Sequence, residues 1–291
     1  MNISKNQLEQ YRAETFRTRP GLRINSPNDA VAYVNQRGYV FFWPIKNIIM
    51  PSLWVAAAGD RPVPDAHDDP GHKTWDWKDK LLGKGQWYYG RILRKRNMMI
   101  ALDMLPYFYA LSPNYGDPNE DYLIDYDEGR LTAAAKNIYE ALLKQGPLDT
   151  IALRKYAGLS NQSAQTEFNR ALDDLQSTFR ILPVGVSDAG AWHYAFIYDI
   201  VPRHFPDIIQ RSHAITEPEA RQKILTCYID SLGAVPFKEI HRVFGYQPVN
   251  WPSHITERDL RKMEERGEII QGATVEGIKE PCVVSPRLAK V

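Results

Sequence analysis

Apolar residues in the middle of the chain recur at helical spacing in three successive stretches, which predicts three helices. The first begins after Thr132, whose hydroxyl is a good N-cap, and ends at Gly146. The second is short and stops at Gly158, and Ser160 is expected to cap the third. A group of three helices is therefore predicted in this part of the chain.

Two strands are predicted to follow these helices. Residues 179–186 and 191–198 are strand-like runs, and the Ser-Asp-Ala-Gly sequence at residues 187–190 favours a hairpin between them. A helix-turn-helix followed by a β-hairpin is the pattern of a winged-helix unit, in which the hairpin forms the wing.

The same order of elements returns nearer the C-terminus. Residues 217–232 and 237–244 predict two helices, Thr256 is expected to cap a third, and strands are predicted around residues 269–270 and 282–284. In both copies a glycine and a proline mark the junction between the first and second helices. Two copies of one pattern form an internal repeat, so the second half predicts tandem winged-helix units.

The first half of the chain is less regular. Helices are predicted over residues 27–36 and 51–58, an aromatic run at residues 38–44 ends in proline, and residues 98–111 are apolar enough to be buried. We expect an α+β fold with three parts: a mostly helical, winged-helix-like region over residues 1–130, and winged-helix units over residues 131–210 and 211–291.

Composition places the chain among ordinary globular proteins, since 44% of its 291 residues are hydrophobic and 24% are charged. The first twenty residues are polar and contain no signal-peptide core, and no apolar stretch is long enough to span a bilayer. The two cysteines, Cys227 and Cys282, cannot form a disulfide framework. We expect a cytoplasmic protein that does not associate with membranes.

The net charge of +1 hides a strongly uneven distribution of charge. Residues 72–97 contain eight bases and two acids, a local charge of +6, whereas residues 117–128 contain six acids and no base, a local charge of −6. Because electrostatic fields act over about 10 Å at moderate salt, these segments matter more than their sum. The basic segment is the best sequence candidate for a nucleic-acid surface.

Six bases of this segment are candidates to contact phosphates: Lys78, Lys84, Arg91, Arg94, Lys95 and Arg96. Four of them fall within six residues, a density that is hard to place inside a core. The neighbouring aromatic residues could stack on exposed bases, but they are more simply core residues. Double-stranded DNA is therefore the expected partner.

The third helix of the first winged-helix unit is the expected recognition element. Its outward polar residues are Gln162, Gln165, Asn169 and Arg170, and amide side chains can pair with adenine edges. Asp173 and Asp174 follow on the same helix and would repel phosphates. A transcription regulator or a protein-interaction module therefore remains an alternative to a general DNA-binding protein.

Other kinds of site are not indicated. Residues 67–72 hold two histidines and two aspartates, but aspartate is common in Pro/Gly-bearing loops for turn reasons alone, so no metal site is expected. The sequence has no glycine-rich phosphate loop, nucleophile elbow or dinucleotide fingerprint. We expect no cofactor.

Three stretches together resemble a known family. They are residues 37–59, with Pro-Ser-Leu-Trp at 51–54; residues 75–105, with Tyr-Gly-Arg-Ile-Leu at 89–93; and residues 138–186. They are similar to the bacterial winged-helix DNA glycosylases of the AlkZ/YcaQ type. This resemblance implies winged-helix units around a concave DNA-binding surface, and excision of alkylated bases or unhooking of crosslinks without a metal.

The chain departs from that family at its catalytic motif, so it resembles a divergent, AlkZ-related member. In the family, a Gln-x-Gln or Gln-x-Asp motif before a proline holds the attacking water. The matching positions here are Phe41 and Trp43, which offer no such acceptor. The catalytic residues are therefore unknown, with Asp76 and Asp79 as weak candidates. We predict a repair-associated DNA-binding protein with little or no glycosylase activity by the usual route.

Overall fold

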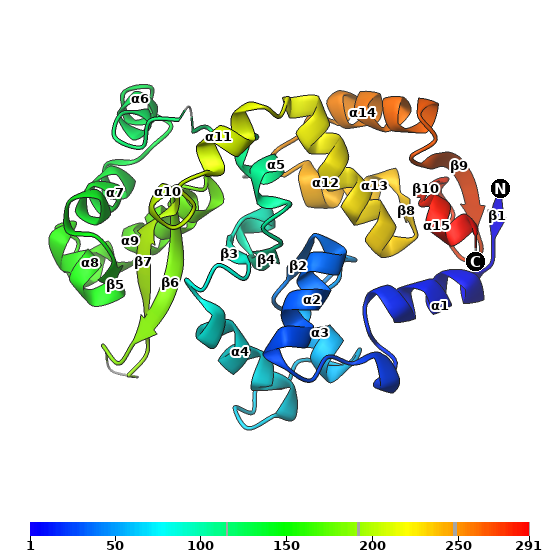
Figure 1. Cartoon of the computed structure of the whole chain (residues 1–291), viewed down its shortest axis with the longest axis horizontal. Coiled ribbons are helices and arrows are strands. Elements are labelled where there is room, and N and C mark those ends of the chain that lie inside the picture. Colours follow the sequence, from blue (N-terminus) through cyan, green and yellow to red (C-terminus); the bar gives the residue numbers. More distant parts are fainter. Residues whose placement is uncertain (115, 191–192, 247–248, 291) are drawn as a thin grey trace.

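The computed structural model describes residues 1–114, 116–190, 193–246 and 249–290. It is an assembly of helices and short strands in which both termini lie at the same end (Figure 1). The elements form three successive units, and each unit has the order helix, strand, helix, helix, strand, strand. The mixture of helices and strands agrees with the predicted α+β class.

The first unit lies in the N-terminal half, for which the sequence predicted a mostly helical, winged-helix-like region. It comprises α2 (Pro27–Arg37), β2 (Tyr39–Phe41), α3 (Leu53–Ala58), α4 (Lys73–Leu81), β3 (Tyr88–Arg91) and β4 (Asn97–Ile100). Its sheet has the order β2-β4-β3, and both strand pairs are antiparallel. A helix α5 (Leu105–Tyr109) and an acidic helix α6 (Asp121–Asp127) lead to the next unit.

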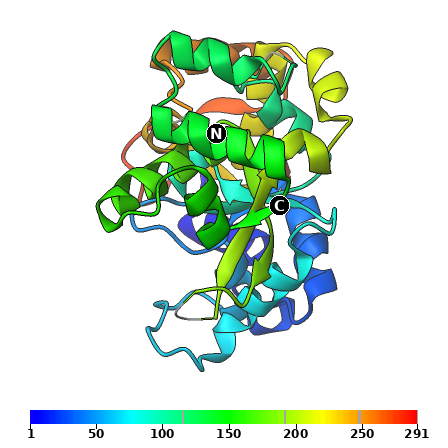
Figure 2. The same cartoon turned by 90° about the vertical axis from the view of Figure 1, so that its left-hand side faces the viewer.

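The second unit comprises α7 (Ala133–Gln145), β5 (Leu148–Asp149), α8 (Thr150–Tyr156), α9 (Gln165–Ser177), β6 (Ile181–Ser187) and β7 (Ala195–Ile200). Its sheet order, β5-β7-β6, repeats that of the first unit. The β6–β7 hairpin runs down beside β3 and α4 of the first unit (Figures 1 and 2). Short helices α10 (Val201–His204) and α11 (Ile208–His213) connect it to the third unit.

The third unit comprises α12 (Glu217–Leu232), β8 (Ala234–Pro236), α13 (Phe237–Phe244), α14 (Ser253–Glu265), β9 (Ile270–Val275) and β10 (Cys282–Val284). The N-terminal strand β1 (Asn2–Ile3) pairs in parallel with β9, so the sheet order is β1-β9-β10-β8. The helix α1 (Lys5–Thr15) packs against α12 and α15 (Pro286–Ala289). The two ends of the chain are therefore held together in one unit.

Most predicted helices are present, with some starts displaced. The Thr132 hydroxyl does cap α7, and α12 and α13 have the predicted bounds. The predicted cap at Ser160 is wrong, because a 3-10 turn over Gln162–Ala164 precedes α9. The predicted cap at Thr256 is also wrong, because α14 begins at Ser253 after a proline. The predicted strand start at Ala191 lies outside the described residues.

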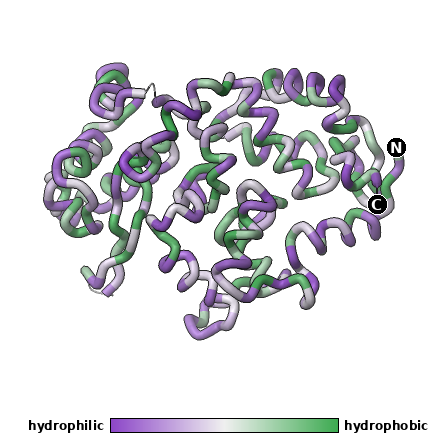
Figure 3. Tube along the Cα trace, viewed as in Figure 1, coloured by the Kyte–Doolittle hydropathy of each residue, from purple (hydrophilic) through white to green (hydrophobic). Residues whose placement is uncertain are grey.

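One large apolar core joins the first and third units. Figure 3 shows hydrophobic residues concentrated in inner elements such as α12, whereas the outer α14 is mainly hydrophilic. Within this core, the buried Tyr39 hydroxyl donates a hydrogen bond to the Ile224 carbonyl at 2.9 Å. The second unit has a core of its own around α7 and α9, and Phe179 and Leu182 extend the shared core to its edge.

Candidate nucleic-acid interface

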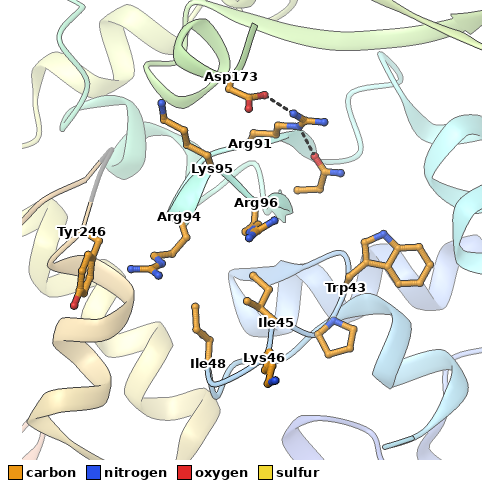
Figure 4. A pocket seen from close by; sticks show the side chains of 12 residues that line it. Trp43, Ile45, Lys46, Ile48, Arg91, Arg94, Lys95, Arg96, Asp173 and Tyr246 are labelled. Carbon is orange, nitrogen blue, oxygen red and sulfur yellow. Dashed lines mark hydrogen bonds and ion pairs between the residues drawn. The ribbon is translucent and has the colours of Figure 1, made fainter. Parts of the chain in front are cut away.

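A basic pocket of about 840 Å³ opens where the three units meet (Figure 4). Its walls come from the segment after β2, the β3–β4 turn, α9 and the residues just after α13. The lining residues are Trp43, Pro44, Ile45, Lys46, Ile48, Arg91, Arg94, Lys95, Arg96, Asn97, Asp173 and Tyr246. Five of them are bases and one is an acid, so the formal charge of the lining is strongly positive.

The β3–β4 turn projects the bases into this pocket. Arg91 and Asn97 are partners across the two antiparallel strands, while Leu93 in the 3-10 turn (Leu93–Lys95) is buried in the core. Arg94 and Lys95 both have left-handed backbone conformations, with φ of 57° and 51°. Such conformations are costly for residues with side chains and cluster at functional sites. The turn anchors its apolar residues inward and turns its bases outward.

Two of the bases are neutralised by acids on α9. The Arg91 guanidinium forms an ion pair with Asp173, and the Lys95 ammonium forms one with Asp174. Arg91 also donates a hydrogen bond from Nε to the Asn97 side-chain oxygen at 3.3 Å. The two acids that the sequence indicated as repulsive to phosphate are therefore already paired with bases.

Three other bases of the pocket are free of acidic partners within the described residues: Lys46, Arg94 and Arg96. The Arg94 guanidinium lies 4.4 Å from the ring centre of Tyr246, a cation–π contact that leaves its charge uncompensated. Lys46 and Arg96 are exposed to solvent. These three bases form the unpaired cation cluster of the pocket.

The other predicted DNA contacts on α9 and the turn before it are exposed but lie outside the pocket: Gln162, Gln165, Asn169 and Arg170. Gln165 donates a hydrogen bond to Asn169, one helical turn further on, and Asp173 follows after another turn. One face of α9 thus leads from these amides to the pocket. Lys84 is exposed in the turn between α4 and β3 and does not line the pocket.

The prediction that Lys78 contacts phosphate is wrong, because its side chain is buried with 1% exposure. Its ammonium forms an ion pair with Asp79 at 2.7 Å and donates a hydrogen bond to the Tyr194 hydroxyl at 2.9 Å. The rings of Trp75 and Phe196 lie 4.5 and 4.6 Å from it. Burial lowers the pKa of Lys78, although Asp79 opposes that effect. Lys78 joins α4 to the β6–β7 hairpin.

The aspartates considered as replacement catalysts lie away from the pocket. Asp76 is exposed on α4 and pairs with Lys80 at 2.7 Å, and Asp79 is occupied by Lys78 and Tyr194. Phe41, at the first position of the expected catalytic motif, is 1% exposed within the sheet. Trp43, at the second position, is among the lining residues, and its ring packs against that of Phe42, with 4.7 Å between the ring centres.

Besides apolar residues, the structure brings four residues with polar side chains to the pocket that the sequence did not single out as contacts: Lys46, Asn97, Asp173 and Tyr246. Lys46, Asp173 and Tyr246 lie outside the basic segment in the sequence, and Asn97 ends that segment but carries no charge. Only their place in the fold gives them a common role, so no motif could have identified them.

Across the described residues, no helix has both the length and the apolar character needed to cross a bilayer. In that same part of the chain, no three His, Cys, Asp or Glu side chains gather closely enough to hold a metal ion.

Comparison with known proteins identifies the family. The AlkZ-related family matches residues 24–245, well over half of the chain. Among solved structures, the DNA glycosylase AlkZ of Streptomyces sahachiroi has a similar fold, with a TM-score of 0.63 and 13% sequence identity. The similarity covers 100% of this chain and 72% of that one. No curated protein matches the sequence. The chain therefore belongs to the AlkZ-related family.

Proposed function

We propose that this protein binds double-stranded DNA through the basic pocket and acts in DNA repair. The unpaired cation cluster carries the proposal, because Lys46, Arg94 and Arg96 come from two separate segments and converge on one pocket. Bases without acidic partners are poised to neutralise phosphates and to release their counterions. The family and the AlkZ fold similarity support a repair-related role.

We further propose that the three parts of the chain, residues 1–130, 131–210 and 211–291, each contain one winged-helix unit, with β1 and α1 of the first part packed on the third. The β-hairpin at the end of each unit would be its wing, and α9 would be a DNA-facing helix. The exposed amides of Gln165 and Asn169 on α9 suit contacts with base edges or phosphates. Asp173 and Asp174 do not argue against this role, since Arg91 and Lys95 neutralise them.

The experiment is a fluorescence anisotropy titration of a labelled duplex at several salt concentrations. We expect binding at 25–50 mM salt that weakens steeply as salt is raised, as counterion release requires. Absence of duplex binding at low salt would refute the proposal. Selection from random duplexes provides a second check, because one strongly enriched palindrome would identify a transcription regulator instead.

A further inference from the structure

A row of aromatic rings extends from the basic pocket towards the β6–β7 hairpin. It begins at Trp43, which is among the residues that line the pocket and whose ring is directed away from Arg94 (Figure 4). The Trp43 ring lies 6.3 Å from that of Trp75 on α4, measured between ring centres, and the Trp75 ring lies 6.0 Å from that of Tyr194, just before β7. Trp43, Trp75 and Tyr194 form the aromatic row, which joins the first unit to the second beside the basic pocket.

Trp75 differs from the other tryptophans of the basic segment because it is exposed. It is 43% exposed, whereas Trp77 and Trp87 are 6% and 4% exposed. The expectation that these aromatic residues belong to the core therefore holds for Trp77 and Trp87 but not for Trp75. Single exposed apolar residues are ordinary, but one that continues a row of rings out of a charged pocket indicates a binding surface.

Packing holds the indole of Trp75 in place. The Lys78 ammonium lies 4.5 Å from its ring centre, and the Phe42 ring meets it nearly edge-on, with 6.1 Å between the ring centres. Lys78 is itself buried and is bonded to Asp79 and Tyr194, so the group that supports the indole is also fixed. A ring that is already held in one position loses little conformational entropy when a ligand stacks on it.

We propose that the aromatic row stacks the unpaired bases of a single strand that leaves a duplex bound at the basic pocket. The inference rests on the proposed DNA binding, since the unpaired cation cluster would hold the adjoining phosphates. Every base has a flat π-face, so stacking on these rings requires no particular sequence. The first unpaired base would stack on the face of Trp75 opposite the Lys78 ammonium.

The chemistry of the surface favours unpaired DNA over other partners. Paired bases are stacked on one another and present only their edges in the grooves, so a duplex alone offers no base face to the row. The bases of the pocket require an anionic partner, and a nucleic-acid strand supplies phosphates and flat rings at once. The protein should therefore bind a junction of single-stranded and double-stranded DNA more tightly than a blunt duplex.

The experiment is an anisotropy titration of a labelled duplex that carries a single-stranded extension of deoxyadenosines, prepared in both strand polarities. A matched duplex with an abasic extension keeps every phosphate and lacks only the bases of the extension. We expect wild-type protein to bind the deoxyadenosine extension about 10-fold more tightly than the abasic one, as stacking of one base requires. Stacking involves no phosphate, so the two slopes of log affinity against log salt should be equal.

Two substitutions of Trp75 test whether its ring is responsible. Trp75→Ala should remove the preference for bases, whereas Trp75→Phe should keep most of it, because phenylalanine still offers a flat ring. Neither variant should change the affinity for the duplex with the abasic extension. Tyr156→Ala is the matched control and should behave as wild type, since Tyr156 on α8 is 56% exposed but belongs neither to the row nor to the pocket lining.

The outcomes separate this inference from the proposed function. Equal affinity of wild-type protein for the two extended duplexes would overturn base stacking by the aromatic row and leave duplex binding standing, with a protein partner as the next candidate for the exposed rings. A preference for bases that persists in W75A, folded as judged by circular dichroism, would also overturn it. Protein that binds none of the duplexes would overturn both proposals.

Discussion

The unpaired cation cluster should account for most of the salt dependence of DNA binding. Replacing Lys46, Arg94 and Arg96 by alanine removes three bases that lack acidic partners within the described residues. Each phosphate contact contributes about 0.9 to the slope of log affinity against log salt, so the triple variant should lose about 2.7 of that slope. Between 50 and 200 mM salt, wild-type affinity should then fall about 40-fold further than that of the variant.

The assay compares this variant with a triple variant that loses the same charge elsewhere. Lys155, Lys279 and Lys290 are exposed and lie outside the pocket, and their replacement by alanine should leave the slope nearly unchanged. Anisotropy titrations at five salt concentrations give both slopes on the same duplex. Equal slopes for the two folded variants would refute the reasoning and move the DNA surface away from the pocket.

Two further predictions concern stability. Burial raises the pKa of Tyr198 to about 12 from an ordinary value of 10. The neutral hydroxyl is favoured in the folded state, so its contribution to the free energy of unfolding is complete below pH 10 and is lost as pH rises through 12. Urea titrations should show that wild type loses about 3 kcal/mol more stability over this range than Tyr198→Phe, and equal losses would contradict it. Gly233→Ala should destabilise more than Gly267→Ala: both glycines have positive φ, but only at Gly233 would the new Cβ meet a side chain, 2.7 Å from Tyr11. Thermal melts that show equal losses for the two variants would refute this clash.

The sequence predicted the third unit better than the first because its boundaries have local causes. Thr216 caps α12 through its side chain, Gly233 ends that helix with a positive φ, and residues 217–232 were predicted as observed. The first unit has the same order of elements, but β2 contains three residues that are all buried. Such a run has no alternation to reveal a strand, and the long loop before α4 hides the repeat.

Two errors come from treating residue types singly. Thr256 is a good N-cap by residue type, but it lies inside α14 and is 2% exposed. Its hydroxyl donates a hydrogen bond to the Pro252 carbonyl, one helical turn earlier, at 3.4 Å. Lys78 is a base within a basic segment, yet it shares a helical stripe with Thr74 and Trp77, both buried. The spacing of these three residues on one helical face is the sequence signal that would have placed Lys78 inward.

Charge pairing between distant segments decides how many bases of the predicted basic surface are free to bind phosphate. Arg91 and Lys95 meet acids that lie 82 and 79 residues further along the chain, where the sequence indicated separate basic and acidic elements. The local charge of +6 therefore overstates the positive field at the pocket. The acids on α9 repel phosphate less than their place in the sequence suggested, because each is paired with a base. The same pairing fixes the Asp173 carboxylate beside Asn97. The ion pairs that limit phosphate binding therefore also hold α9 against the β3–β4 turn.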